Sequence, residues 1–170
     1  MTLLVLLHAL AVEPLAQPPP GPSPLVPVRV HGVVGNREVG AEIGVGRAEA
    51  LTQTEATVHV GWFFAHEFEM SFFGGVQFAN GAGGPTVDFT LLAEPSVHLP
   101  LGRDVDGFAG LGGGLGFSKD GVGVAIEQRV GADIVLGPAA TLTPALAVLY
   151  ATNRPQTASL GATVGYAITW

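Results

Sequence analysis

The chain has 170 residues, which is enough for one domain and little more. Only 12 % of its residues are charged and Lys119 is its single lysine, whereas about a quarter of a soluble domain is normally charged. The net charge of −7 argues against a nucleic-acid partner, which requires a basic surface. The absence of cysteine excludes a disulfide framework, a thiolate metal site and a cysteine-linked lipid anchor.

The amino terminus begins with an apolar run, Thr2 to Val12, of the length expected for the core of a secretory signal. We expect a signal peptide over residues 1–16, although cleavage after Ala11 also fits the pattern. A buried strand or helix is the alternative, since no Lys or Arg precedes the run. Residues 17–35 follow as a proline-rich lead-in, because proline excludes helix and sheet ladders. Within it, residues 26–34 form either an extra short strand or the approach to the first long one.

From Asn36 onward, apolar residues alternate with small or polar residues in segments separated by turn residues. Such alternation indicates β-strands with one apolar face. No run of about 18 apolar residues occurs, so the sequence predicts no membrane-spanning helix. The eight expected strands are 38–48, 55–64, 67–78, 86–98, 106–118, 121–135, 139–151 and 159–170.

The two faces of these strands differ in side-chain size. One face carries large residues such as Trp62 and Phe89, and the other is mostly Gly, Ala, Ser and Thr with a few acids. A soluble lipocalin-like barrel would turn the apolar face inward. Large aromatic side chains would overfill an eight-stranded interior, whereas they fit against lipid. A closed barrel also pairs every backbone group, as a bilayer requires. We therefore predict an all-β, eight-stranded antiparallel up-and-down transmembrane β-barrel over residues 36–170.

The last segment, SLGATVGYAITW, places Tyr166, Ile168 and Trp170 on its apolar face. This ending and the repeated alternation resemble the small eight-stranded outer-membrane barrels of Gram-negative bacteria, the OmpA/OmpX-like group. The resemblance implies an outer-membrane location, contact with outer-membrane lipid and insertion by the barrel-assembly machinery, with these three residues as the insertion signal. It also implies periplasmic termini, and therefore a periplasmic aromatic belt made of Trp62, Phe64, Phe68, Tyr166 and Trp170.

Matching inward-facing residues across the turns brings the charged residues of the lumen together. Arg129 is then the one cation placed in the middle of the barrel, among the carboxylates of Glu42, Glu69, Glu94 and Glu127. We expect an ion-pair network, since charges in a narrow interior need partners. At the periplasmic end, Glu67 is expected to face His98. The alternative is a narrow cation-preferring pore, for which the surplus carboxylates and the glycines at positions 110, 112, 114 and 116 would leave room.

Catalytic and metal chemistry have weak support in the sequence. Nucleophilic catalysis needs a serine, a base within hydrogen-bond reach and a group that orients the base. Ser96, His98 and Glu67 are the best candidates, but lipid-modifying barrels act near the outer leaflet and these residues fall at the periplasmic end. His59, His66 and His98 lack a recognised metal-ligand spacing, so we predict no catalytic residue, metal or cofactor.

The extracellular connections are short and offer little surface for adhesion, so no protein partner is predicted. The sequence favours a small structural or porin-like outer-membrane protein.

Overall fold

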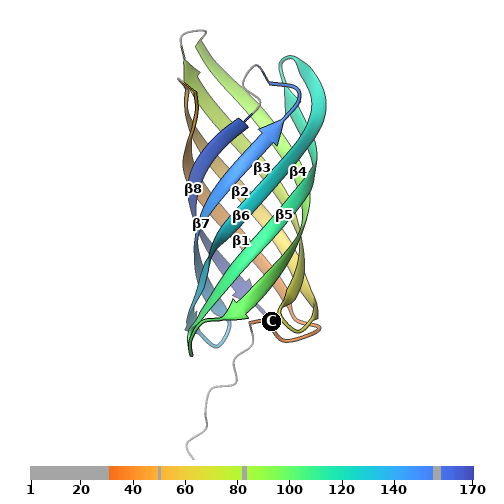
Figure 1. Cartoon of the computed structure of the whole chain (residues 1–170), viewed down its shortest axis with the longest axis vertical. Helices are drawn as coiled ribbons and strands as arrows, with labels where there is room; N and C mark the ends of the chain where they lie inside the picture. The colour runs from red at the N-terminus through yellow and green to blue at the C-terminus, as the bar shows by residue number, and fades with distance from the viewer. Residues whose placement is uncertain (1–30, 50, 82–83, 155–157) are drawn as a thin grey trace, which may run out of the picture.

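The computed structural model describes residues 31–49, 51–81, 84–154 and 158–170. These residues form antiparallel strands that close into one barrel in chain order (Figure 1). The strands are β1 (Arg37–Ala48), β2 (Leu51–Ala65), β3 (Phe68–Gly81), β4 (Gly84–Pro100), β5 (Val105–Ser118), β6 (Gly121–Gly137), β7 (Ala140–Ala151) and β8 (Ala158–Thr169). The predicted eight-stranded antiparallel barrel is confirmed. The expected signal peptide and residues 17–30 of the lead-in lie outside the described residues.

The strands run further than the sequence pattern indicates. β2 begins at Leu51 rather than at residue 55, and β3 continues to Gly81. Asn80 and Gly81 were expected in a turn, yet they pair with Pro85 and Gly84 of β4. The ladder therefore extends past the residues that favour strands, because pairing with a neighbour already in place outweighs weak local preference.

Each of two prolines lies in a gap in the pairing with one of its two neighbouring strands. Pro95 of β4 lies where the pairing with β5 stops after Ala93 and resumes at Ser96. Pro144 of β7 pairs with Val164 of β8 but lies within a gap in the pairing with β6. Both positions agree with the lack of a backbone N–H in proline.

The barrel closes between its first and last strands. Their register runs from Glu38 opposite Thr169 to Arg47 opposite Leu160. One step beyond, Arg37 and Trp170 exchange two backbone hydrogen bonds of 2.9 Å each. The end of the barrel that contains this pair is called the termini end, and the end with the β7–β8 connection is called the opposite end (Figure 1).

The distribution of polarity is the reverse of that in a soluble protein. Large apolar side chains point outward along every strand, with Ile43 71 % exposed. Among the described residues, more polar or charged side chains than hydrophobic ones are buried, and they line the lumen. No helix in the described part of the chain is long and apolar enough to cross a membrane.

The residues of the expected aromatic belt all lie on the outer face, in the half of the barrel that includes the termini end. They are Trp62, Phe64, Phe68, Tyr166 and Trp170, and each is at least 40 % exposed. Trp62 stacks on Phe72 at 5.5 Å between ring centroids, and Phe64 packs on Phe68 at 6.3 Å. Ile168, expected with Tyr166 and Trp170 in the insertion signal, also points outward.

Candidate functional site in the lumen

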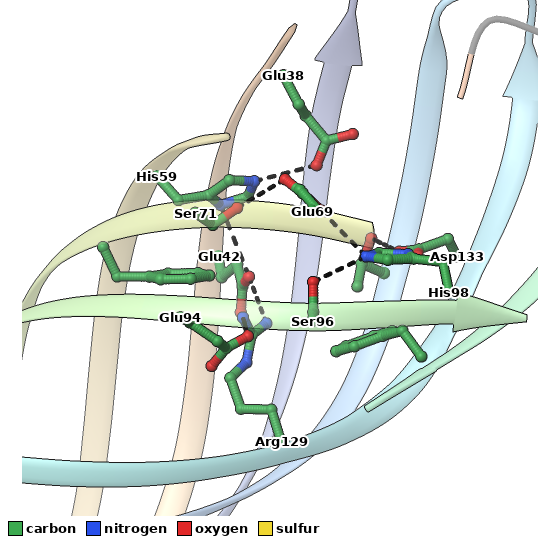
Figure 2. Close-up of a pocket in the computed structure, with 13 residues that line it drawn as sticks. Glu38, Glu42, His59, Glu69, Ser71, Glu94, Ser96, His98, Arg129 and Asp133 are labelled. Carbon is green, nitrogen blue, oxygen red and sulfur yellow. Dashed lines mark hydrogen bonds and ion pairs between the residues drawn. The ribbon is translucent and has the colours of Figure 1, made fainter. Parts of the chain in front are cut away.

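The middle of the lumen is crossed by the side chain of Arg129 from β6. Its guanidinium donates to Oε1 of Glu42 on β1 at 2.6 Å and to Oε1 of Glu94 on β4 at 3.3 Å (Figure 2). Nε lies 3.8 Å from a carboxylate oxygen of Glu127. These four residues are called the central cluster, and Arg129 is only 6 % exposed. A buried cation with several carboxylates is held in place, because removing one partner would leave an uncompensated charge.

Aromatic rings support the guanidinium. The ring centroid of Phe73 on β3 lies 4.7 Å from Cζ of Arg129, and that of Phe108 on β5 lies 5.6 Å away. Both distances are within the range of a cation–π contact. The sequence analysis missed these two residues, because it assigned the large aromatic side chains to the outer face.

Glycines of the lumen wall make room for the carboxylates. A Cβ atom on Gly110 would clash with the carboxylate of Glu94, and one on Gly165 would lie 2.8 Å from Cγ of Glu42. A Cβ atom on Gly116, at the opposite end, would lie 3.1 Å from the side chain of Asn153. At positions 110 and 116, the space that suggested a pore wall from the sequence is therefore occupied by neighbouring side chains.

His98 of β4 lies at the centre of a second group, near the termini end. Its Nδ1 lies 2.8 Å from Oδ2 of Asp133 on β6. Its Nε2 lies 2.9 Å from Oγ of Ser96 and 3.1 Å from Oε2 of Glu69 (Figure 2). Thr143 of β7 donates to the other oxygen of Asp133 at 2.7 Å. Glu69 was expected beside Arg129. It pairs with His98 and is not part of the central cluster.

The expected pairing of Glu67 with His98 is wrong at the level of side chains. Glu67 lies in the turn between β2 and β3, where its φ of 66° is left-handed and its side chain is exposed. Its backbone carbonyl accepts a hydrogen bond from the N–H of His98 at 2.7 Å. The turn ends the alternation, so the next inward carboxylate, Glu69, takes the contact instead.

A histidine from the lead-in closes the termini end. His31 precedes β1 and is only 5 % exposed. Its Nδ1 lies 3.3 Å from Oε2 of Glu38, and its Nε2 lies 3.4 Å from Oδ2 of Asp133. Its ring packs edge-on against Phe63 at 5.0 Å and His98 at 5.4 Å. Burial alone would lower the pKa of His31, but the carboxylates of Asp133 and Glu38 outweigh burial and raise it to about 9.

Two further contacts complete this end. Nε2 of His59 on β2 lies 3.3 Å from Oε1 of Glu38, and Thr169 of β8 donates to Oε2 of Glu38 at 3.0 Å. Six buried residues at the termini end are together called the histidine cluster: His31, His59, His98, Glu38, Glu69 and Asp133. From the sequence, His31 falls within residues 26–34, for which an extra short strand and the approach to the first long strand were both open; the structure places it in a turn before β1 with its side chain buried.

An arginine from a connection closes the opposite end. Nε of Arg154, between β7 and β8, lies 3.1 Å from Oδ2 of Asp88. Arg154 also donates to the side-chain oxygen of Gln77, whose amide donates to Gln53 at 3.0 Å. This cap was also missed, because Arg154 follows the last residue of the alternating segment.

The space left between these groups is small. One cavity of about 30 Å³ lies between the histidine cluster and the central cluster, and another of about 20 Å³ lies on the far side of Arg129. A water molecule needs roughly 10–15 Å³, so each cavity has room for about one or two waters.

Ser96, His98 and Asp133 have the order of contacts of a catalytic triad. The carboxylate is on Nδ1 of the imidazole and the hydroxyl is on Nε2. Glu69 competes for the same Nε2, however, and the adjoining cavity of about 30 Å³ has no room for an acyl substrate. The serine and histidine considered from the sequence do meet, with Asp133 in the place that Glu67 was expected to fill.

Comparison with known proteins identifies the fold and no sequence relative. No protein-family model matches the chain, and no curated protein matches it. Among solved structures, Neisserial surface protein A has a TM-score of 0.60 at 9 % identity, covering 78 % of this chain and 95 % of that one. The outer-membrane protein OprG from Pseudomonas aeruginosa has a TM-score of 0.57 at 9 % identity, covering 81 % and 96 %.

A third similar structure is the outer-membrane enzyme PagL, with a TM-score of 0.51 at 11 % identity, covering 77 % of this chain and 98 % of that one. The chain thus has the fold of the small eight-stranded outer-membrane barrels, as the resemblance in its sequence implied. Identities this low show the fold alone, and barrels of this fold include both enzymes and other proteins.

Proposed function

We propose that the protein is an integral protein of the bacterial outer membrane with a structural role, and that its lumen does not conduct ions. The outer face supports the membrane location, since apolar side chains cover it and the strands close without a free edge. The observation that carries the proposal is the filling of the lumen, in which paired charges occupy the middle and both ends.

The central cluster fills the middle of the closed lumen. Arg129 reaches carboxylates on β1 and β4 from β6, so its contacts span the cross-section of the barrel. The cavities on its two sides are each about the size of a water molecule or two. A hydrated cation passing through would have to break these pairs and displace Phe73 and Phe108. The cation-preferring pore is therefore the less supported alternative.

Conductance of the refolded full-length chain in a planar bilayer tests this proposal. We expect no channel events from the wild type and none from Arg129→Ala, because Phe73, Phe108 and the two ends still block the path. Channel events from the wild-type protein would contradict the closed lumen. Migration on a gel without and with boiling serves as the control, since a folded barrel changes mobility on heating and an unfolded chain does not.

We also propose that the barrel is not an enzyme, because Ser96 faces a cavity too small for a lipid substrate. The matched test compares the lipid A of cells that produce the wild type with that of cells producing Ser96→Ala at equal membrane levels. Identical lipid A in both, and in cells without the protein, is the expected result. A modification present with the wild type and lost with Ser96→Ala would overturn this part of the proposal.

A further inference from the structure

The histidine cluster contains three ligating atoms that converge on one point at the termini end. They are Nε2 of His31, Nδ1 of His98 and Oδ2 of Asp133; ligand atoms of these residues lie within 4.8 Å of one another, and all three residues are buried. We propose that this point is a binding site for one divalent transition-metal ion of the Zn²⁺ type. This inference goes beyond the structural role proposed above and does not depend on whether the lumen conducts.

The distances between the ligating atoms suit such an ion. Zn²⁺ binds imidazole nitrogen and carboxylate oxygen at about 2.0–2.2 Å, so two ligands of a tetrahedron are roughly 3.3–3.6 Å apart. Nε2 of His31 lies 3.4 Å from Oδ2 of Asp133, and Nδ1 of His98 lies 2.8 Å from the same oxygen. The second separation needs to open by about 0.5–0.8 Å to reach the tetrahedral range. The two rings, at 5.4 Å and 71° to each other, can both point a nitrogen at the shared oxygen.

Each ligand also has a polar neighbour at its other polar atom, through a hydrogen bond for His98 and Asp133 and through an ion-pair contact for His31. Nδ1 of His31 lies 3.3 Å from Glu38, and Nε2 of His98 lies 2.9 Å from the hydroxyl of Ser96. Thr143 donates to Oδ1 of Asp133 at 2.7 Å. Metal-binding histidines almost always make such a contact through the second ring nitrogen, which fixes the ring and its tautomer. The arrangement therefore provides three ligands of a tetrahedral site together with neighbouring groups that can orient them.

An independent observation comes from the ring of His31. It is 5 % exposed, yet neither of its nitrogens makes a hydrogen bond of good geometry within the described residues. The carboxylate oxygens at 3.3 and 3.4 Å are ion-pair contacts only. Leaving a buried polar atom without a hydrogen bond costs about 1–3 kcal/mol, and an ion bound to Nε2 would remove that cost.

Charge and ligand type indicate which ion fits. Glu38, Glu69 and Asp133 supply an excess of carboxylates at this end, and Oδ2 of Asp106 lies 3.9 Å from Nε2 of His31 as a fourth oxygen. A divalent cation would balance these charges. Two imidazole ligands favour Zn²⁺, Cu²⁺ or Ni²⁺ over Ca²⁺ and Mg²⁺, which prefer oxygen ligands.

The test measures Zn²⁺ binding to the refolded full-length chain after treatment with a chelator. We expect one Zn²⁺ per chain by elemental analysis after gel filtration, and Co²⁺ in its place should give the visible absorption of a four-coordinate nitrogen–oxygen site. His31→Ala should weaken binding by more than the roughly 10–100-fold that loss of a supporting group costs. Thr143→Val removes only a supporting hydroxyl and should weaken binding within that range.

The matched control is His66→Ala, which removes an exposed histidine of the β2–β3 turn. It should bind Zn²⁺ like the wild type. Absence of Zn²⁺ from the wild type, or equal affinity in His31→Ala and the wild type, would overturn the site. Should His31→Ala lose the heat-dependent gel shift, the wild-type stoichiometry and Thr143→Val decide the question. The same gel shift and the conductance assay show separately whether the proposed structural role holds.

Discussion

The two ends of the lumen are closed in the same way but with different chemistry. At each end a basic side chain from outside the strands enters the barrel, His31 at the termini end and Arg154 at the opposite end. His31 meets a network of buried histidines and carboxylates, whereas Arg154 meets one aspartate and the amide of Gln77. The comparison shows that eight strands alone leave the openings unfilled, and that residues beyond the alternating pattern complete the packing.

Titratable groups are concentrated at the termini end. In the histidine cluster most members have two or more polar partners, so the loss of one is felt by several others. At the opposite end the contacts form a short chain from Asp88 to Gln53 through Arg154 and Gln77. Ligand binding is therefore expected at the termini end, whereas the residues of the opposite end are expected only to fill the opening of the lumen.

The largest effect is expected from deletion of Trp170, which removes the last rung between β8 and β1. Unpaired backbone groups at the seam are costly in lipid, and the sequence predicts that this residue is also part of the insertion signal. Most of the protein should then be missing from the outer-membrane fraction in a fractionated immunoblot. Trp62→Ala is the control within the same belt and should insert normally; an equal loss would mean that the belt acts as a whole and that the terminus has no special role.

Arg129→Met removes the buried cation that lies between the two ends of the lumen. Glu42 and Glu94 would remain buried without their partner, and loss of one partner of a buried pair costs about 3–5 kcal/mol. Urea unfolding of the refolded barrel in detergent measures this loss. Lys119→Ala, whose ion pair with Asp120 is exposed, should change the free energy of unfolding by less than about 0.5 kcal/mol. Similar values for both variants would contradict the account of the central cluster.

Matched aspartate variants compare the ends directly. Asp133→Ala removes the hydrogen-bond partner of both His98 and Thr143, and bonds to charged groups contribute about 1.5–3 kcal/mol each. Asp88→Ala removes one contact of Arg154, which keeps its hydrogen bond to Gln77, and should cost about 1–2 kcal/mol, less than Asp133→Ala. The same urea assay gives both values. A larger loss for Asp88→Ala would reverse the comparison.

A smaller effect than that of Arg129→Met is expected from Arg154→Ala. The side chains of Arg154 and Asp88 are 7 % and 11 % exposed, but Arg154 makes one ion pair and one hydrogen bond where Arg129 meets three carboxylates, so its loss should lower the free energy of unfolding by about 1–2 kcal/mol. Conductance should remain absent, because the central cluster and the termini end still close the lumen. Channel events in this variant alone would show that the opposite end, and not the middle, is the barrier.

The strand order and the outward face followed from the two-residue period, which is why residues 36–170 could be placed from the sequence. The contacts of Arg129 with Glu94 and Glu127 also followed, because the register of tight hairpins fixes which inward residues meet. Glu42, on the strand across the lumen, was expected near Arg129 only as another inward carboxylate of the middle. The prediction for Glu67 was wrong because the left-handed residue in its turn ends the alternation.

His31 and Arg154 could not be found in this way. Arg154 lies beyond the long alternating segments and His31 lies in the lead-in before them, and only the three-dimensional closure of the barrel brings them to the lumen. Phe73 and Phe108 were missed for a related reason: an inward aromatic is accommodated only where a neighbouring wall position is small, as Gly131 is beside Phe108. Such cross-barrel fits depend on residues distant in the sequence.

The burial of His31 has a consequence for the order of assembly. Its contacts come from β1, β4 and β6, through Glu38, His98 and Asp133, which are far apart along the chain. They exist together only once the barrel is complete, so His31 can dock only as a last step. The fraction of protein in which the segment just before β1 resists added protease would then measure the fraction of barrels that have closed.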